Sequence, residues 1–156
     1  MEILLILAVI GILTTAGLTG LHRLSQNQAY QGYVAGFSQA VSDATSRANE
    51  TNTIYAIEFS PAGYSWGPVS GSLSACSGAA SAPALTSTQT DRQAPNGVSV
   101  GDTGWFCFSA PGLIYRLGNL TKTCSYKSYT FPCLTFTGPG KSEKMFLSVG
   151  GQVVVE

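Results

Sequence analysis

The stretch MEILLILAVIGILTTAGLTGLH (residues 1–22) decides the fold of the N-terminal part of the chain. After Glu2, nineteen residues without charge run from Ile3 to Leu21. In a helix they rise about 1.5 Å each and span roughly 28 Å, close to the thickness of the hydrocarbon core of a bilayer. The stretch therefore predicts a membrane-spanning helix over residues 1–21.

Two alternatives explain this segment less well. A secretory signal peptide has a basic n-region, a shorter apolar core and a small-residue cleavage site, whereas here an acid precedes the apolar run. A buried helix of a globular core usually has a polar face, and residues 3–21 show none. Both alternatives are disfavoured.

Glu2 is unfavourable in a membrane helix. A carboxylate costs roughly 2.5–3.5 kcal/mol at the centre of such a helix and less near its end. Glu2 either lies among the lipid headgroups or meets a cation from another subunit. Its position and spacing leave both alternatives open.

Residues 22–52 predict an amphipathic continuation of the helix. Apolar residues recur there at spacings of three and four, which places them on one face. Polar residues cluster at 49–52, where we expect the helix to end. The apolar stripe, which should pack on a sheet, consists of Tyr30, Tyr33, Val34, Phe37, Ala40, Val41, Ala44 and Ala48.

Residues 53–156 predict an antiparallel β domain. TIYAIEF (53–59) alternates between apolar and polar residues, and the turn SPAG connects it to YSW in the pattern of a hairpin. A Gly/Ser/Ala/Pro/Thr-rich stretch at 67–97 predicts loops. Further strands are expected at 98–100, 105–109, 113–117, 129–131, 133–136, 145–149 and 152–155, the last two joined by a Gly-Gly turn. The predicted fold class is α+β, with one long helix, membrane-spanning in its first half, packed on an antiparallel sheet or sandwich.

Charge and histidine content argue against several classes of function. The 156 residues contain eight Lys and Arg and eight Asp and Glu, a balance that is not typical of a nucleic-acid binder. The single histidine, His22, borders the apolar run. A Ser-His-Asp or Cys-His arrangement in the β domain is therefore excluded, and we expect neither an enzyme nor a cofactor.

Four cysteines fall in the β domain, none of them in a CxxC pair, which argues against a zinc site. A domain carried across the membrane meets an oxidising compartment, which favours disulfides. Three pairings can be drawn, and four reduced thiols are the remaining alternative. We favour Cys76–Cys107 and Cys124–Cys133 because both close local loops, each worth about 3 kcal/mol in the chain-entropy model.

MEILLILAVIGIL (1–13) resembles the N-terminus of type IV pilins and type II secretion pseudopilins. In those families Phe-Thr-Leu-x-Glu follows a cleavage point, and an apolar run with Gly-Ile-Leu comes next. Glu2 matches the family glutamate and Gly11 the glycine before Ile-Leu. The basic leader, the cleavage glycine and the first three mature residues are absent. Many pilins have a proline where this chain has Thr19, and Gly17 and Gly20 flank that place; we expect them to allow local melting of the helix on assembly.

The order of elements is similar to that of H-type pseudopilins and FimT/FimU-like minor pilins. The resemblance implies a filament subunit in which Glu2 meets the N-terminal amine of a neighbouring subunit and sets register. It implies other copies or other pilins, a prepilin peptidase and an assembly platform as partners. It also implies an inner-membrane location before assembly, then a pilus at the cell surface or a periplasmic pseudopilus, with the β domain outside the cytoplasm.

Two related functions remain as alternatives, a pseudopilus subunit of type II protein secretion and a minor pilin that binds DNA for uptake. The resemblance places DNA contacts on basic residues near the C-terminus. Scattered lysines would bind phosphates weakly and with strong salt dependence, and Glu143 and Glu156 stand close to two of them, so DNA binding is not favoured. The four lysines in question are Lys122, Lys127, Lys141 and Lys144.

Overall fold

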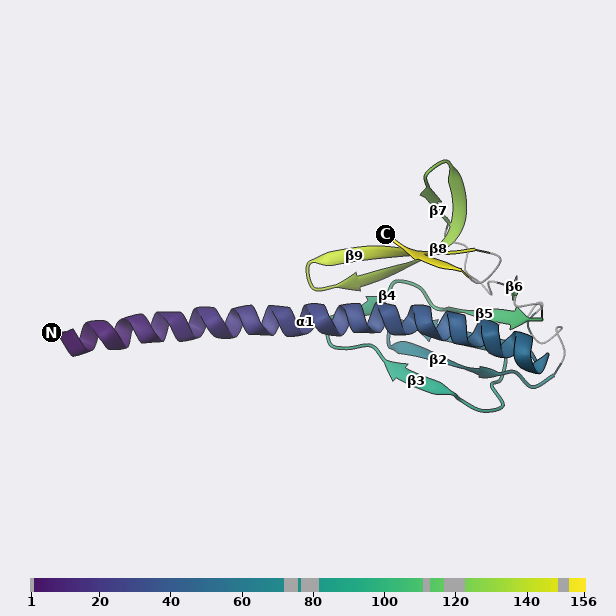
Figure 1. Cartoon of the computed structure of the whole chain (residues 1–156), viewed down its shortest axis with the longest axis horizontal. Helices are drawn as coiled ribbons and strands as arrows, with labels where there is room; N and C mark the ends of the chain where they lie inside the picture. Colours follow the sequence, from purple (N-terminus) through teal and green to yellow (C-terminus); the bar gives the residue numbers. More distant parts are fainter. Residues whose placement is uncertain (1, 72–75, 77–81, 111–112, 117–122, 149–151) are drawn as a thin grey trace.

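A computed structural model describes the chain except for Met1 and residues 72–75, 77–81, 111–112, 117–122 and 149–151. Side chains of the helix are described from Gly20 onward, and those of residues 113–116 are not described. Within these limits the fold is α+β, with one long helix packed on antiparallel sheets (Figure 1). The predicted fold class is confirmed at this level.

The helix α1 runs without a break from Glu2 to Thr51. Asn52, the first residue after the helix, has a left-handed backbone conformation with a φ of 51°, which asparagine tolerates better than most residues. The predicted end at 49–52 is therefore confirmed. The predicted apolar stripe is confirmed as well, because every one of its residues from Tyr30 to Ala48 is at most 5% exposed and belongs to the main core.

The described residues form ten strands in two antiparallel sheets. The first sheet has the order β3-β2-β1-β5-β6, and the second has the order β10-β9-β8-β4, with β7 paired to β8. The strand bounds are β1 Tyr55–Ser60, β2 Gly63–Pro68, β3 Thr90–Gln93, β4 Ser99–Val100, β5 Gly104–Ser109, β6 Leu113–Arg116, β7 Thr123–Tyr126, β8 Tyr129–Gly138, β9 Lys141–Leu147 and β10 Val153–Val155.

The main core lies where α1 meets both sheets. Phe37 is fully buried there, and its ring makes edge contacts with Phe59 and Tyr64 of the first sheet and with Phe136 of the second, at centroid distances of 6.1, 5.1 and 5.3 Å. Such pairs add about 0.5–1.5 kcal/mol each beyond the area that they bury. Phe37 therefore joins the helix to both sheets.

Two glycines of α1 let β3 approach the helix. The guanidinium of Arg92 lies against Gly32 and Gly36, and a Cβ atom at Gly36 would collide with Arg92 Nη1 and lie 2.9 Å from the hydroxyl of Tyr64. Burial raises the pKa of the Tyr64 phenol, while a hydrogen bond from Arg92 lowers it. The edge strand β3 is thus tied to the helix through one arginine.

The strand predictions are mostly confirmed, with four differences. β9 begins at Lys141, four residues before the strand expected at 145–149. β3 lies inside the stretch expected to be loops, and β7 falls in a segment where no strand was expected. β8 continues through Pro132, where it changes partner from β7 to β9. Proline has no N–H to donate to a ladder, which is why it is tolerated at such a boundary. The Gly-Gly turn at 150–151 lies outside the described residues.

Candidate functional site

The N-terminal half of α1 extends well beyond the β domain (Figure 1). The first described side chains of this projecting part are largely exposed, with Leu21 at 64% and Leu24 at 54%. Two exposed leucines are not unusual on a protein surface. They follow directly on the uncharged run of residues 3–21, and the two features together make this half of α1 a candidate for contacts outside the domain.

The predicted assembly residues lie mostly outside the described side chains. Glu2, Gly11 and Gly17 fall within α1, but their surroundings are not described. Gly20 is exposed, and a Cβ atom built on it would meet nothing within 4 Å. Among the residues whose side chains the structure describes, no helix is long and apolar enough to cross a bilayer. Of the predicted span at 3–21, only residues 20 and 21 are among them.

Both predicted disulfides are present, Cys76–Cys107 with a Cα–Cα distance of 6.3 Å and Cys124–Cys133 with 5.7 Å. The two bonds have different surroundings. Cys76 and Cys107 are fully buried in a small cluster on the outer face of the first sheet, together with Trp105. Cys124 is partly exposed, and its bond to Cys133 closes the base of the β7–β8 hairpin. The first bond therefore holds Cys76 on the outer face of the first sheet. The second bond links the two strands of the β7–β8 hairpin at its base.

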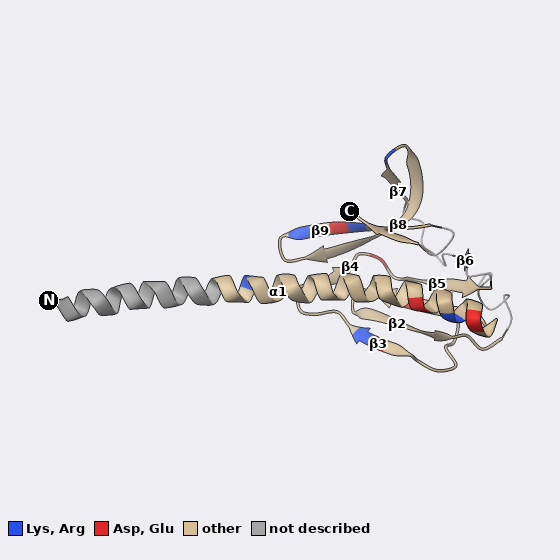
Figure 2. Ribbon diagram, viewed as in Figure 1, with Lys and Arg blue, Asp and Glu red and all other residues tan. Residues whose placement is uncertain are grey.

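The structure does not bring the described lysines together (Figure 2). Lys127 lies in the β7–β8 turn, whereas Lys141 begins β9 beside the opposite end of β8. Lys141 pairs with Glu143 at 3.1 Å and lies over the ring of Tyr30 at 4.3 Å. Lys144, three residues further on, points to the other face of β9. Lys122 lies outside the described residues.

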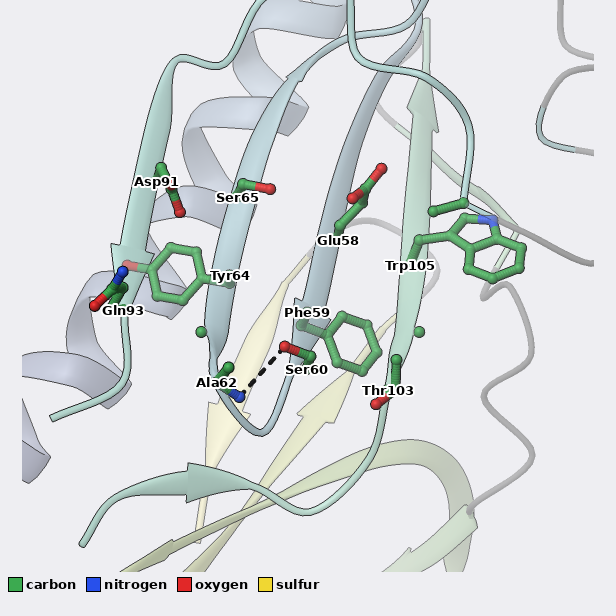
Figure 3. A pocket seen from close by; sticks show the side chains of 13 residues that line it. Glu58, Phe59, Ser60, Ala62, Tyr64, Ser65, Asp91, Gln93, Thr103 and Trp105 are labelled. Carbon is green, nitrogen blue, oxygen red and sulfur yellow. Dashed lines mark hydrogen bonds between the residues drawn. The ribbon is translucent and has the colours of Figure 1, made fainter. Parts of the chain in front are cut away.

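A groove of about 510 Å³ opens on the outer face of the first sheet. Strand register places Asp91, Ser65, Glu58 and Trp105 in one row across β3, β2, β1 and β5. Figure 3 shows these residues on four neighbouring strands, with the Trp105 indole turned away from Glu58. With strands about 4.8 Å apart, the Cα atoms of the two acids are about 10 Å apart. We call this the outer-face groove; Gln93 and Thr103 also line it.

The outer-face groove is acidic, and the tryptophan at its edge has a covered indole nitrogen that points away from it. No Lys or Arg is among its described lining residues, because Arg92 turns to the opposite face of β3. Burial raises the pKa of the Glu58 carboxyl. Trp105 is 5% exposed, and its Nε1 has no hydrogen-bond partner, which costs about 1–3 kcal/mol for a buried polar group.

The outer-face groove was not predicted from the sequence. Glu58 and Asp91 are thirty-three positions apart, and only the pairing of three strands places them on the two sides of Ser65. The one local hint was the alternation in TIYAIEF, which places Glu58 on the face opposite the helix.

The described residues contain no group of three or more His, Cys, Asp and Glu side chains that could hold a metal ion. His22 contacts the side chain of Gln26 at 3.0 Å and lies on the exposed part of α1. Comparisons of the chain with family models, with curated proteins and with solved structures find no match. Function is therefore inferred from the geometry of the chain itself.

Proposed function

We propose that the chain is a structural subunit of a type IV pilus-like filament, which assembles through its apolar N-terminal helix. The observation that carries this proposal is the asymmetry of α1. One half of a continuous helix is buried against two sheets, while the other half extends past the domain with exposed leucines. The C-terminal half of this helix packs on its own domain, and the N-terminal half has an apolar sequence and lies outside the domain. Such a helix is suited to packing in a bundle with copies of itself.

The sequence of the projecting half supports the same proposal. Its uncharged run of Ile3 to Leu21 is long enough to span a bilayer before assembly and to pack in an apolar bundle afterwards. A carboxylate at position 2 is then the one group that needs a cationic partner. We propose that an amine of the neighbouring subunit supplies it, so that subunits pack in one register.

The experiment is the replacement Glu2→Ala in the full chain. Removing one member of a buried charge pair costs about 3–5 kcal/mol, so filament yield should fall by more than about tenfold. Membrane insertion should be unchanged or easier, because a charge has been removed. Yield is counted by electron microscopy, and insertion by fractionation of membranes.

Glu50→Ala is the matched control, because it makes the same substitution near the other end of α1. The Glu50 side chain is 64% exposed and lies 3.9 Å from Arg47, an exposed pair worth about 0–1 kcal/mol. Filaments should form normally with this variant. Equal filament yield for Glu2→Ala and Glu50→Ala would contradict the assembly role and favour a headgroup position for Glu2.

A further inference from the structure

Strand β10 is an open, uncharged edge of the second sheet. It stands at the end of the order β10-β9-β8-β4, with no described strand on its other side. Its residues are Val153, Val154 and Val155, and the last two are 43% and 41% exposed. At the edge of the first sheet, by contrast, β3 carries Asp91 and Arg92. Charged side chains keep an edge strand from pairing with another chain, and β10 has none.

The backbone of β10 has hydrogen-bonding groups that its own sheet does not use. Just beyond the strand, Glu156 and Lys144 exchange both of their N–H···O bonds, at 2.9 and 2.7 Å. Bonded and non-bonded pairs alternate along an antiparallel ladder, so the N–H and C=O groups of Val153 and Val155 point away from β9. No turn or loop bond of the described residues reaches these groups either. They remain for a strand of another molecule.

We infer that β10 pairs in antiparallel fashion with β10 of a second copy. The register that uses all the outward groups places Val153 opposite Val155 of the second copy, and Val155 opposite Val153. Each of these two pairs exchanges both of its bonds. The two Val154 residues then face each other on a twofold axis, so the contact uses the same surface of both copies.

The side chains fit this register on both faces of the sheet. Val154 shares a face with its neighbour Phe146 on β9, and Tyr126 packs on Phe146 at a centroid distance of 5.1 Å. Pairing therefore continues one apolar row across the twofold axis. On the other face, where Val153 packs against the main core, valine meets valine. Cross-strand pairs of apolar, β-branched side chains stabilise a sheet.

The ends of β10 favour a second copy as the occupant. In the same register, Gln152 lies opposite Glu156 of the second copy at each end of the contact. The amide can donate to the carboxylate, and no like charges face each other. The donor that Glu156 needs across this edge is thus supplied by the same strand, which makes β10 complementary to itself.

This contact goes beyond the proposed filament function. Strands β8 and β9 run along the axis of α1 in Figure 1, so an antiparallel pair of β10 strands sets the two α1 helices in opposite directions. Subunits related by a helical repeat all point the same way. Pairing through β10 therefore joins copies that belong to different filaments or have not yet assembled, and it does not depend on Glu2.

The first test is cross-linking of Val154→Cys in the full chain, in detergent, with copper-phenanthroline as the oxidant. All four native cysteines are in disulfides, so the introduced thiol is the only free one. Across the twofold axis the Cα atoms of residue 154 are about 4.5 Å apart, which suits a disulfide. A non-reducing gel should show a disulfide-linked dimer.

Val155→Cys is the matched control, because Val155 is almost as exposed as Val154. In this register the two copies of residue 155 are offset by two residues along the strands, which separates their Cα atoms by about 8 Å. That separation exceeds the reach of a disulfide, so this variant should stay monomeric. Cross-linking of Val154→Cys no faster than that of Val155→Cys overturns the inference.

Three further variants separate pairing from folding, with association measured by sedimentation and folding by circular dichroism. Val155→Pro removes only an outward N–H, which an edge strand tolerates, and should weaken association about tenfold or more. Val154→Lys and Val154→Glu each place like charges on the axis and should not self-associate. An equimolar mixture of these two should associate. A mixture that associates no better than either variant alone contradicts β10 pairing, whether or not Val155→Pro folds.

Discussion

The two halves of α1 share one secondary structure and differ in what stabilises it. In the packed half, Tyr33 and Phe37 are fully buried, whereas Leu21 and Leu24 in the projecting half are mostly exposed. Most helical stability in proteins comes from packing of an apolar face, not from intrinsic propensity. The packed half is therefore held by its own domain, and the projecting half depends on whatever it meets outside the domain.

The largest effect should come from removing Phe37. Phe37→Ala should lower the free energy of unfolding by about 3–5 kcal/mol, the usual cost of truncating a buried phenylalanine, because Phe37 contacts both sheets. Leu24→Ala on the same helix is the control and should change domain stability by no more than about 0.5 kcal/mol. Denaturant unfolding of both variants in detergent measures this. Similar losses for the two would show that the projecting half is also packed on the domain.

Alkaline pH should destabilise the packed half of α1 and leave the projecting half unaffected. Burial raises the pKa of Tyr30 to about 12, and the nearby Glu143 carboxylate adds to this shift. Burial, and then Tyr64, raise the pKa of Tyr33 to about 12. Because both folded values exceed the ordinary value of 10.0, the stability these tyrosines provide is complete below about pH 10 and is lost as pH rises toward 12. Phenolate absorbance and near-ultraviolet circular dichroism should change together over that range.

A control for this titration is Tyr129, which is largely exposed at the start of β8. In the variant Tyr129→Phe, the alkaline loss of structure should be unchanged. In Tyr33→Phe, the unfolding transition should move to higher pH, since one buried phenol no longer has to ionise. An unchanged transition in Tyr33→Phe would mean that this tyrosine does not control the alkaline limit.

The packed half of α1 could be predicted well because the pattern that indicates it lies within one continuous stretch of the sequence. The stripe from Tyr30 to Ala48 repeats at the helical period, and every member of it is in the core. The hairpin of β1 and β2 was also predictable, since alternation and a turn suffice to indicate it. Both disulfides were predicted from loop length alone.

Features that depend on pairing between distant segments could not be predicted. β3 reads TDRQ, a polar edge strand without an apolar alternation, and it becomes a strand only because β2 lies beside it. The contact of the Arg92 guanidinium with Gly32 and Gly36 requires the same pairing of β3 with β2. The outer-face groove depends on the register of four strands, so its row of Asp91, Ser65, Glu58 and Trp105 had no counterpart in the sequence.

A smaller effect is expected at Gly36. In Gly36→Ala the added methyl group would displace Arg92 and press on the hydroxyl of Tyr64, and such overpacking typically costs about 1–3 kcal/mol. Alanine is the better helix former by about 1 kcal/mol, which offsets part of the loss. The net decrease in stability should be about 1 kcal/mol. Thermal unfolding measures it, and Arg92→Ala in the same chain should restore part of the loss by removing the obstacle.

The smallest effect is expected at Gly20, and its sign should be opposite. A Cβ atom there would meet nothing within 4 Å, so Gly20→Ala retains only the gain in helix propensity, about 1 kcal/mol. That gain should slow amide exchange around residue 20 by about fivefold and leave the unfolding of the β domain unchanged. Hydrogen exchange of the full chain in detergent measures it. If the helix must loosen at Gly17 and Gly20 during assembly, the stiffer variant should also form filaments more slowly. Faster exchange in Gly20→Ala would mean that this stretch is already covered, and the contrast between the two halves of α1 would then fail at this point.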